Sequence, residues 1–243
     1  MFYPITKEFK TNTTNTTTTN SQKWTLIKEL TQDSTDTSEI YEVKDNNDIV
    51  YILKHMPFII YGHTHEDEQH LKKLEKAVLK EIQVHTKCFL LGIAPEIIDA
   101  WLCNKGAVII MKKLTTTVCN ILGQYKSSSI KILVLKEVFE LISKMHENGI
   151  CHGDTHLSNF MVNTTVTNIT LTKNMTEIEK FKHMKYTIYV IDFGSTDSIR
   201  ENEKQDYIIC SMFLVHHLSK RKSRQLVEQL NVLTKEEIDR IFE

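Results

Sequence analysis

Glycine and proline are scarce in this chain, which has seven and three of them among its 243 residues. This scarcity excludes a collagen-like chain and a Gly/Pro-rich disordered one. Long hydrophobic runs are also lacking, because none approaches the roughly 20 apolar residues that cross a bilayer. The first ten residues, MFYPITKEFK, show neither the apolar core nor the cleavage site of a signal peptide. We therefore expect an intracellular, cytoplasmic protein that does not bind membranes.

An excess of charge of one sign is absent as well. The chain has 30 basic and 31 acidic residues and a formal net charge of −1. Such a balance gives no field that would attract nucleic acid, so we expect no nucleic acid to be bound directly. The five cysteines are scattered and form no Cys-x-x-Cys pair, which indicates reduced thiols in a cytosol-like compartment.

Residues 22–113 show the pattern of a sheet with one helix. Residues 1–21 before them include the low-complexity run TNTTNTTTTNS, and we expect this segment to be disordered. The runs WTLIKEL, SEIYEV and DIVYILKHM are rich in β-branched and aromatic residues and predict three antiparallel strands, and APEIIDAWLCN and GAVIIMKKL predict two more. Between the third and fourth strands, apolar residues recur about every 3.6 positions up to Gly92, which predicts one long helix. The residues of this apolar stripe are Leu71, Leu74, Val78, Ile82 and Phe89.

Residues 114–243 have a mainly helical pattern. The run SIKILVLKEVFELISKMHENG carries apolar residues at helical spacing and ends at Gly149. Residues 163–185 form an insertion, in which TEIEKFKHM predicts a short helix. The chain therefore has the pattern of an α+β protein in two parts, the first with strands and the second mainly with helices.

A cluster of polar residues, HGDTHLSNF, directly follows the helix that ends at Gly149. In a loop, its Asp154 and Asn159 can converge on one metal ion or phosphate group. A third polar group, Asp192, follows the apolar strand YTIYVI, where a carboxylate is costly unless a cation meets it. Carboxylate and amide oxygens are ligands that Mg²⁺ accepts beside phosphates, and Lys54 on the third strand offers a cation for those phosphates.

Taken together, these segments resemble the protein-kinase-like superfamily over nearly all of residues 24–218. HGDTHLSN is similar to the kinase catalytic loop, IDFG to the magnesium loop, and VYILK to the third strand with its lysine. The resemblance is above all to the small atypical Ser/Thr kinase of the KEOPS tRNA-modification complex, with RIO-type kinases and aminoglycoside or choline phosphotransferases as neighbours. It implies a two-lobed fold, with a five-stranded antiparallel N-lobe sheet plus one helix over 22–113 and a shortened, mainly helical C-lobe over 114–243.

The resemblance implies roles for the polar residues of the second part. Asp154 would accept or orient the proton of the attacking hydroxyl, and His156 would assist at the γ-phosphate of ATP. Asn159 and Asp192 would hold Mg²⁺. His152 would brace the loop, and the buried aspartate of these families, which opens the next helix and bonds to the catalytic-loop backbone, falls on Asp206.

The resemblance also implies a nucleotide site in the first part. KEIQVHTKCFLLGIAPEIID is similar to the helix of the KEOPS-type kinase, and this alignment selects Glu81 as the partner of Lys54, which would contact the α and β phosphates. Further nucleotide-binding residues would come from the phosphate-covering loop and from the gatekeeper and hinge. They are Asp33, Thr35 and Ser38 in the loop, and Met111, Lys112 and Lys113 at the hinge.

Three departures from the kinase pattern leave three hypotheses open. Asp33, Thr35 and Ser38 stand where the phosphate-covering loop of kinases has glycines, no arginine precedes Asp154, and only eleven residues separate Gly194 from Asp206, with no Ala-Pro-Glu motif. The first hypothesis is an atypical Ser/Thr protein kinase that transfers the γ-phosphate of ATP to a protein hydroxyl, with a partner protein that completes its active state. The second is a small-molecule phosphotransferase, and the third is a pseudokinase binding module. The Asn/Thr-rich composition is typical of an AT-rich genome, such as that of a large DNA virus or a protist, and a viral protein would act in the host cell.

Overall fold

A computed structural model describes six stretches of the chain. They are residues 24–30, 38–57, 68–103, 106–165, 175–196 and 203–242. The predicted disorder of residues 1–21 therefore concerns residues outside the described ones. The chain divides into two compact units, which we call the N-terminal unit (residues up to Phe89 together with Pro95–Lys113) and the C-terminal unit (Leu90–Ala94 together with Leu114–Glu243).

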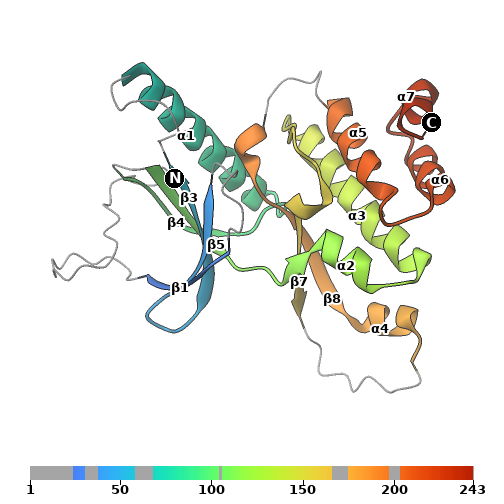
Figure 1. Ribbon diagram of the computed structural model, residues 1–243, viewed down its shortest axis with the longest axis horizontal. Helices are drawn as coiled ribbons and strands as arrows, with labels where there is room; N and C mark the ends of the chain where they lie inside the picture. Colours follow the sequence, from blue (N-terminus) through green and yellow to red (C-terminus); the bar gives the residue numbers. More distant parts are fainter. Residues whose placement is uncertain are drawn as a thin grey trace. The chain divides into compact units, whose positions relative to one another are not determined.

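Five antiparallel strands form the sheet of the N-terminal unit (Figure 1). Their bounds are β1 (Thr25–Glu29), β2 (Glu39–Lys44), β3 (Val50–Pro57), β4 (Ile97–Cys103) and β5 (Gly106–Lys112). The order of the strands in the sheet is β1-β2-β3-β5-β4, so β5 lies between β3 and β4. This sheet confirms the prediction of five antiparallel strands.

Helix α1 (Glu68–Leu90) is the predicted long helix, and it packs on one face of this sheet. Strand residues that alternate along β3 and β5 point to this face, as the two-residue period of a strand requires. Val78 and Ile82 of α1 share a hydrophobic cluster there with Met56, Ile109 and Met111. The opposite face has its own cluster of buried residues. Its members are Val43, Leu53, Trp101, Val108 and Ile110.

The C-terminal unit is mainly helical and contains a second, smaller sheet. Its helices are α2 (Val118–Gln124), α3 (Ser128–Glu147), α4 (Glu177–His183), α5 (Glu203–Leu214), α6 (Lys220–Leu230) and α7 (Lys235–Phe242). Its strands are β6 (Thr116–Thr117), β7 (Phe160–Thr165) and β8 (Lys185–Val190), which pair antiparallel in the order β6-β7-β8. The short helix expected within the insertion is α4, and the α+β fold class is confirmed.

Helix α3 ends in a hydrogen-bonded cap that leads into the polar loop. Gly149 has a φ of 68°, a left-handed conformation that glycine adopts without steric cost. The N–H of Gly149 donates to the carbonyl of His146 (2.8 Å), and the N–H of Ile150 donates to that of Met145 (3.0 Å). These two bonds form a Schellman motif, so the glycine predicted to close this helix does close it.

The five residues Leu90–Ala94 belong to the C-terminal unit, although the chain on both sides of them belongs to the other unit. The N–H of Val190 donates to the carbonyl of Ile93 (2.8 Å), and Lys144 Nζ donates to the carbonyl of Leu91 (2.6 Å). Ile93 is fully buried. These contacts fix the last residue of β8 just before Asp192.

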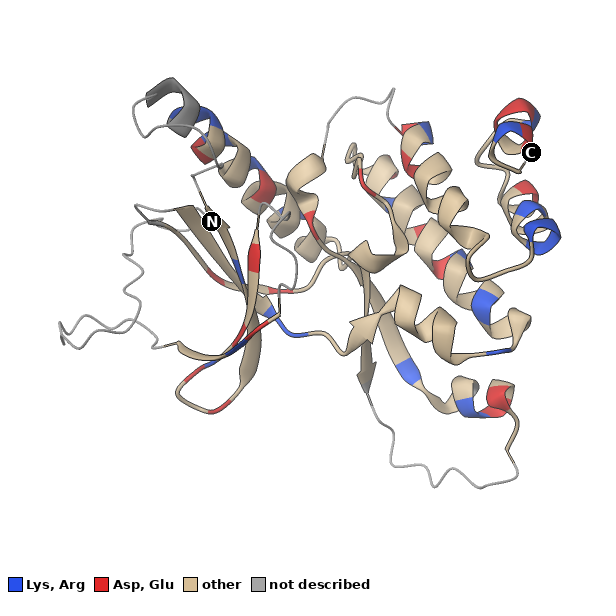
Figure 2. Cartoon of the chain, in the orientation of Figure 1, with Lys and Arg blue, Asp and Glu red and all other residues tan. Residues whose placement is uncertain are grey.

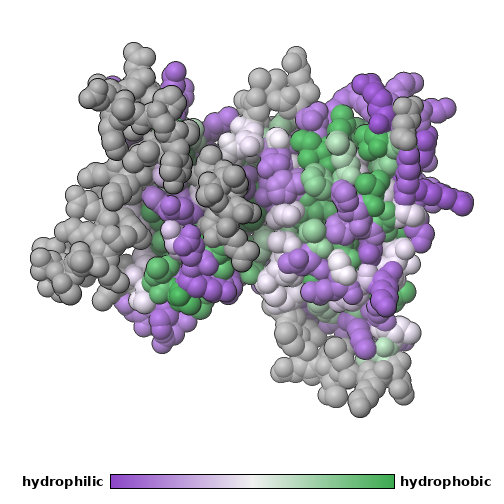
Figure 3. Space-filling view, in the orientation of Figure 1, coloured by the Kyte–Doolittle hydropathy of each residue, from purple (hydrophilic) through white to green (hydrophobic). Residues whose placement is uncertain are grey.

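Charge and hydrophobicity are distributed differently over the surface. Basic and acidic residues are spread over both units, and basic residues gather on α6 (Figure 2). In the space-filling view, hydrophobic surface gathers over α5 and its neighbours in the C-terminal unit (Figure 3). Among the described helices, none is long and apolar enough to cross a membrane.

Candidate functional site

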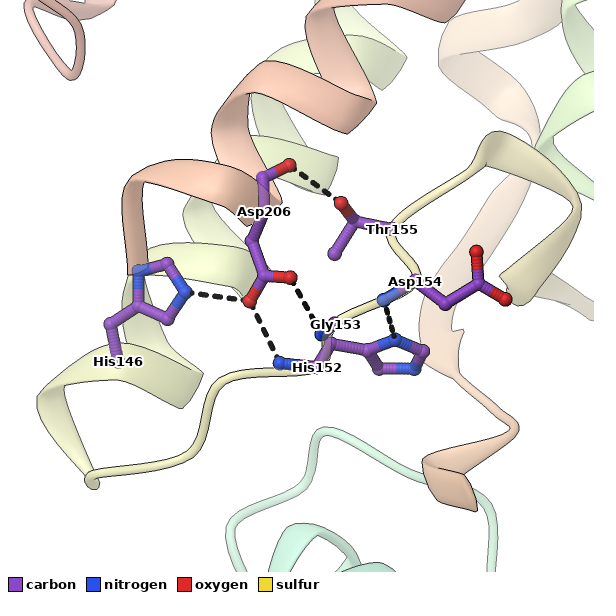
Figure 4. A network of polar contacts seen from close by, with 6 residues as sticks. All are labelled: His146, His152, Gly153, Asp154, Thr155 and Asp206. Atoms are coloured by element: carbon purple, nitrogen blue, oxygen red, sulfur yellow. Dashed lines mark hydrogen bonds and ion pairs between the residues drawn. The ribbon is translucent and has the colours of Figure 1, made fainter. Parts of the chain in front are cut away.

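The polar loop that follows α3 is fixed by one buried carboxylate, that of Asp206 in the first turn of α5 (Figure 4). Its Oδ2 accepts hydrogen bonds from the backbone N–H of His152 (2.7 Å) and from Nε2 of His146 (2.9 Å). Its Oδ1 accepts from the backbone N–H of Gly153 (2.8 Å). The hydroxyl of Thr155 donates to the backbone carbonyl of Asp206 (2.5 Å). Asp206 therefore bonds to the loop backbone, as the kinase resemblance implied.

His152 lies inside this loop as a neutral imidazole. Its Nδ1 accepts the backbone N–H of Asp154 (3.3 Å), so the ring proton is on Nε2, which donates to the carbonyl of Ile191 (2.9 Å). Burial lowers the pKa of His152, which favours the neutral ring. The ring also lies 5.4 Å from that of Phe193, measured between centroids. His152 thus braces the loop against the Asp-Phe-Gly turn, as expected.

Gly153 is the one residue of this loop that must lack a side chain. Its φ is 79°, and a Cβ atom placed on it would lie 2.5 Å from the carbonyl oxygen of Ser195. Ser195 ends the short 3₁₀ turn Phe193–Ser195 that follows Asp192. The loop backbone can therefore approach this turn only if residue 153 is glycine.

The carboxylate of Asp154 is held at one of its two oxygens. Oδ2 accepts from Asn159 Nδ2 at 3.1 Å and lies 3.3 Å from His156 Nε2. The same Asn159 nitrogen donates to the backbone carbonyl of Asp154 (2.9 Å). Oδ1 accepts no hydrogen bond from any residue in the described part of the chain, and the side chain is 44% exposed. Asp154 therefore offers an oriented, accessible oxygen that can accept a proton.

The two candidate metal ligands, Asn159 and Asp192, lie at the same end of the small sheet. Asn159 directly precedes β7 and Asp192 follows β8 by one residue, and these antiparallel strands pair Phe160 with Val190. The N–H of Ile191 donates to the carbonyl of Asn159 (2.9 Å), which ties the two segments together.

The chemistry of these two groups fits a magnesium ion that is bound together with a nucleotide. Because the amide nitrogen of Asn159 is used by Asp154, its amide oxygen is left to serve as a ligand. Asp192 is exposed and has a φ of 63°, an uncommon conformation that Asp tolerates better than most residues. No cluster of three or more His, Cys, Asp or Glu side chains suited to a metal occurs among the described residues. Nucleotide-bound Mg²⁺ needs only one or two carboxylates, since phosphate oxygens and water supply its other ligands.

In the N-terminal unit, Lys54 and Glu81 form a buried ion pair. Lys54 Nζ lies 2.8 Å from Glu81 Oε1, and each side chain is 8% exposed. Lys54 comes from β3 and Glu81 from the middle of α1, so the pair joins the sheet to its helix. One turn after Glu81, His85 Nε2 donates to the carbonyl of Pro95 (2.8 Å), and burial lowers the pKa of His85 to about 4. The lysine and the glutamate selected from the sequence therefore contact each other directly.

The predicted hinge residues differ in what they contact. Met111 lies in the cluster between the sheet and α1. The N–H of Lys112 donates to the carbonyl of Glu96 (2.9 Å). Lys113 Nζ pairs with Glu42 on β2 (2.9 Å) and lowers the pKa of that carboxyl. Lys113 therefore has a carboxylate partner within its own unit.

The phosphate-covering loop is described only at its end. Ser38 lies in a bend that leads directly into β2. Asp33 and Thr35, which were predicted to line the same loop, lie outside the described residues. The role of this loop stays a prediction.

Sequence reasoning missed two residues that support the site. His146 and Thr155 both bond to Asp206, across 60 and 51 positions of the chain. His146 stands in the last turn of α3, where a histidine side chain would be expected to be exposed. No local sequence pattern identifies either residue, because Asp206, the partner of both, is far away in the sequence.

A fixed HGD loop, an Asp-Phe-Gly turn after a strand and a buried Lys–Glu pair that joins an antiparallel sheet to its helix together define a protein-kinase-like domain. The sequence profile of the ABC1 atypical kinase-like domain matches residues 92–229, more than half of the chain. The chain belongs to this family. No curated protein sequence matches the chain. The superfamily expected from the sequence is thus confirmed, while the closeness to the KEOPS and RIO kinases and the viral or protist origin stay predictions.

Proposed function

We propose that this chain is an atypical Ser/Thr protein kinase that uses ATP and Mg²⁺. The observation that carries the proposal is the state of Asp154: Asn159 holds its Oδ2, Oδ1 accepts no hydrogen bond in the described part of the chain, and the side chain is 44% exposed. A general base needs this combination of fixed direction and access to its substrate. Membership of a kinase-like family supports phosphate as the group transferred.

Asp154 has the central role in the proposed reaction. It orients the acceptor hydroxyl through Oδ1 and takes its proton while the hydroxyl oxygen bonds to the γ-phosphorus of ATP and the bond from that phosphorus to ADP breaks. His156 stands beside the same carboxylate, where its imidazole would assist at the γ-phosphate during transfer.

Other residues position the nucleotide. Asn159 and Asp192 would supply an amide and a carboxylate oxygen to Mg²⁺, which neutralises charge on the phosphates when it is bound. Lys54 would contact the α and β phosphates, and Glu81 keeps the ammonium group in place. His152 and Asp206 do not touch the reactants; they fix the backbone from which Asp154 and Asn159 extend.

The direct test is transfer of phosphate from γ-labelled ATP by the purified chain, with protein acceptors, with small hydroxylated metabolites, and with no added acceptor. We expect labelled protein, and a loss of about 10²- to 10⁴-fold in kcat for Asp154→Asn with the KM for ATP nearly unchanged. Ser158→Ala is the matched control, because Ser158 is an exposed residue of the same loop. Equal turnover by Asp154→Asn and the parent would refute the proposed base.

A small-molecule phosphotransferase is the second candidate. It is favoured by the short connection of eleven residues between Gly194 and Asp206, which leaves little chain for a surface that docks peptides. Labelling of metabolites without labelling of protein in the same assay would support it.

A further inference from the structure

An aromatic side chain with no role in the proposed reaction lies next to the candidate base. Phe213, in the last turn of α5, is 39% exposed, while Cys210 and Leu214 of the same helix are fully buried. The centroid of its ring lies 6.1 Å from that of His156, with an angle of 56° between the ring planes. The ring of His216, just after α5, lies 6.2 Å from that of Phe213.

His156 needs such a contact because its polar contact with Asp154 is long. The distance of 3.3 Å from Nε2 to Asp154 Oδ2 is beyond the usual range for an N–H···O bond, and the side chain is 32% exposed. One such long polar contact does not by itself hold an exposed imidazole in one orientation. Phe213 is the only aromatic residue in the described part of the chain whose ring contacts that of His156.

Phe213 lies next to other exposed apolar residues at the end of α5. Two further apolar residues close to it in the chain are exposed, Met212 (56%) and Val215 (42%). Of these three, only Phe213 has a ring that can pack against His156. Its position joins these exposed apolar residues to the loop that carries Asp154.

We propose that Phe213 is a positioning residue for phosphate transfer: it holds the imidazole of His156 against Oδ2 of Asp154. With His156 and Asn159 both on Oδ2, rotation of the Asp154 carboxylate is restricted, and Oδ1 keeps the direction from which it meets the acceptor hydroxyl. This inference rests on the proposed function for its catalytic meaning. The contact between the two rings does not depend on that function.

The test compares Phe213→Ala, Phe213→Tyr and, as a matched control, Met212→Ala, which removes an exposed apolar side chain from the adjacent position. Pairs of aromatic rings contribute modestly, so we expect Phe213→Ala to lower kcat by about two- to tenfold with an unchanged KM for ATP. Phe213→Tyr should restore the parent rate, and Met212→Ala should keep it. In a background that carries His156→Ala, Phe213→Ala should cause no further loss.

Nuclear magnetic resonance of the histidine rings gives a readout that is independent of turnover. The resonances of His156, assigned by their disappearance in His156→Gln, should shift in Phe213→Ala because the ring current of Phe213 is lost, and should return towards parent values in Phe213→Tyr. Unchanged His156 resonances in Phe213→Ala would overturn the inference, as would a rate loss that persists in the His156→Ala background.

The two proposals can fail separately. If the parent transfers no phosphate to any acceptor, the proposed function fails, and the resonances alone decide whether Phe213 positions His156. If the parent is active and Phe213→Ala matches it in kcat, the proposed function stands and the role of Phe213 is refuted.

Discussion

Asp206 illustrates how much of this site depends on one residue. Its carboxylate is fully buried and accepts three hydrogen bonds, two from the loop backbone and one from His146. A buried negative charge is costly unless it is bonded in this way. In return, the backbone N–H groups of His152 and Gly153 find a partner that no regular element offers them. Residues 152–156 of the loop are therefore held without helix or strand structure of their own.

Buried neutral histidines make the fold sensitive to acid. Burial lowers the pKa of His85 to about 4, from a usual value near 6.5, and lowers that of His152 in the same direction. Between these two pKa values the folded state therefore binds fewer protons than the unfolded state. The contribution of the neutral histidines to the free energy of unfolding is complete above about pH 6.5 and is lost as the pH falls towards 4. For His85 the loss is roughly 3 kcal/mol.

Urea unfolding of the parent and of His85→Gln between pH 7.5 and 4.5 checks this. Glutamine can still donate to the carbonyl of Pro95 but does not titrate in this range. The free energy of unfolding of His85→Gln should fall less steeply with acid than that of the parent. Parallel curves for the two proteins would contradict the assignment.

At this scale the sequence predicted residues within short motifs better than contacts between distant ones. Asp154, Asn159 and Asp192 are recognisable because their neighbours in the chain identify them. The contact of His156 with Phe213 spans 57 positions and depends on how α5 packs, which no local pattern encodes. The close approach of Gly153 to Ser195 also depends on how distant segments pack, so no local pattern encodes it.

Among the elements, the loop and the turn after β8 are fitted closely to each other. Gly153→Ala should lower the free energy of unfolding by about 1–3 kcal/mol, because the new Cβ would meet the carbonyl of Ser195 and the left-handed backbone would be strained. Gly123→Ala is a suitable control, since it lies in α2 with nothing within 4 Å of the added Cβ. That change should be neutral or stabilising by up to about 1 kcal/mol. Equal stabilities of the two variants, measured by chemical denaturation, would be inconsistent with the tight approach of the loop.

The ion pair between β3 and α1 has both a catalytic and a structural consequence. Lys54→Met should abolish phosphate transfer, and it should also destabilise the fold by about 3–5 kcal/mol, because Glu81 is left as a buried charge without its partner lysine. Adding Glu81→Leu should restore much of the stability but no activity. Kinetic assays and thermal unfolding of both variants measure the two effects, with Lys76→Met, an exposed lysine of the same helix, as the control. Activity in Lys54→Met would show that another lysine serves the phosphates.

Long elements were predicted more successfully than short ones. Helices α1 and α3 repeat their apolar spacing over several turns, so the pattern identifies them. Helix α2 has seven residues and β6 has two, too short to repeat an apolar spacing, although α4, also of seven residues, was predicted. Strand β7 was missed because it directly follows the polar loop and its partner β8 lies beyond the insertion.

For the whole molecule, nucleotide and metal should stabilise the folded state together. A ligand that binds only the native protein stabilises it by about 2.7 kcal/mol at 100 times its Kd, so ATP should raise the melting temperature, and Mg²⁺ should enlarge the rise. Thermal shift measurements test this, with Asp192→Asn expected to lose the Mg²⁺-dependent part. Absence of ATP binding by calorimetry, with either Mg²⁺ or Mn²⁺ present, would favour a pseudokinase instead.

The assignment of Leu90–Ala94 to the C-terminal unit affects how the chain can be divided into fragments. The chain passes from one unit to the other three times, after Phe89, after Ala94 and after Lys113. A fragment that stops at Lys113 would keep Ile93 but lose the strand whose N–H it bonds, and a fragment that starts at Leu114 would leave that N–H without a partner. No single cut therefore yields two intact halves, and a separately expressed C-terminal half would need these five residues restored to it as an added peptide or a graft.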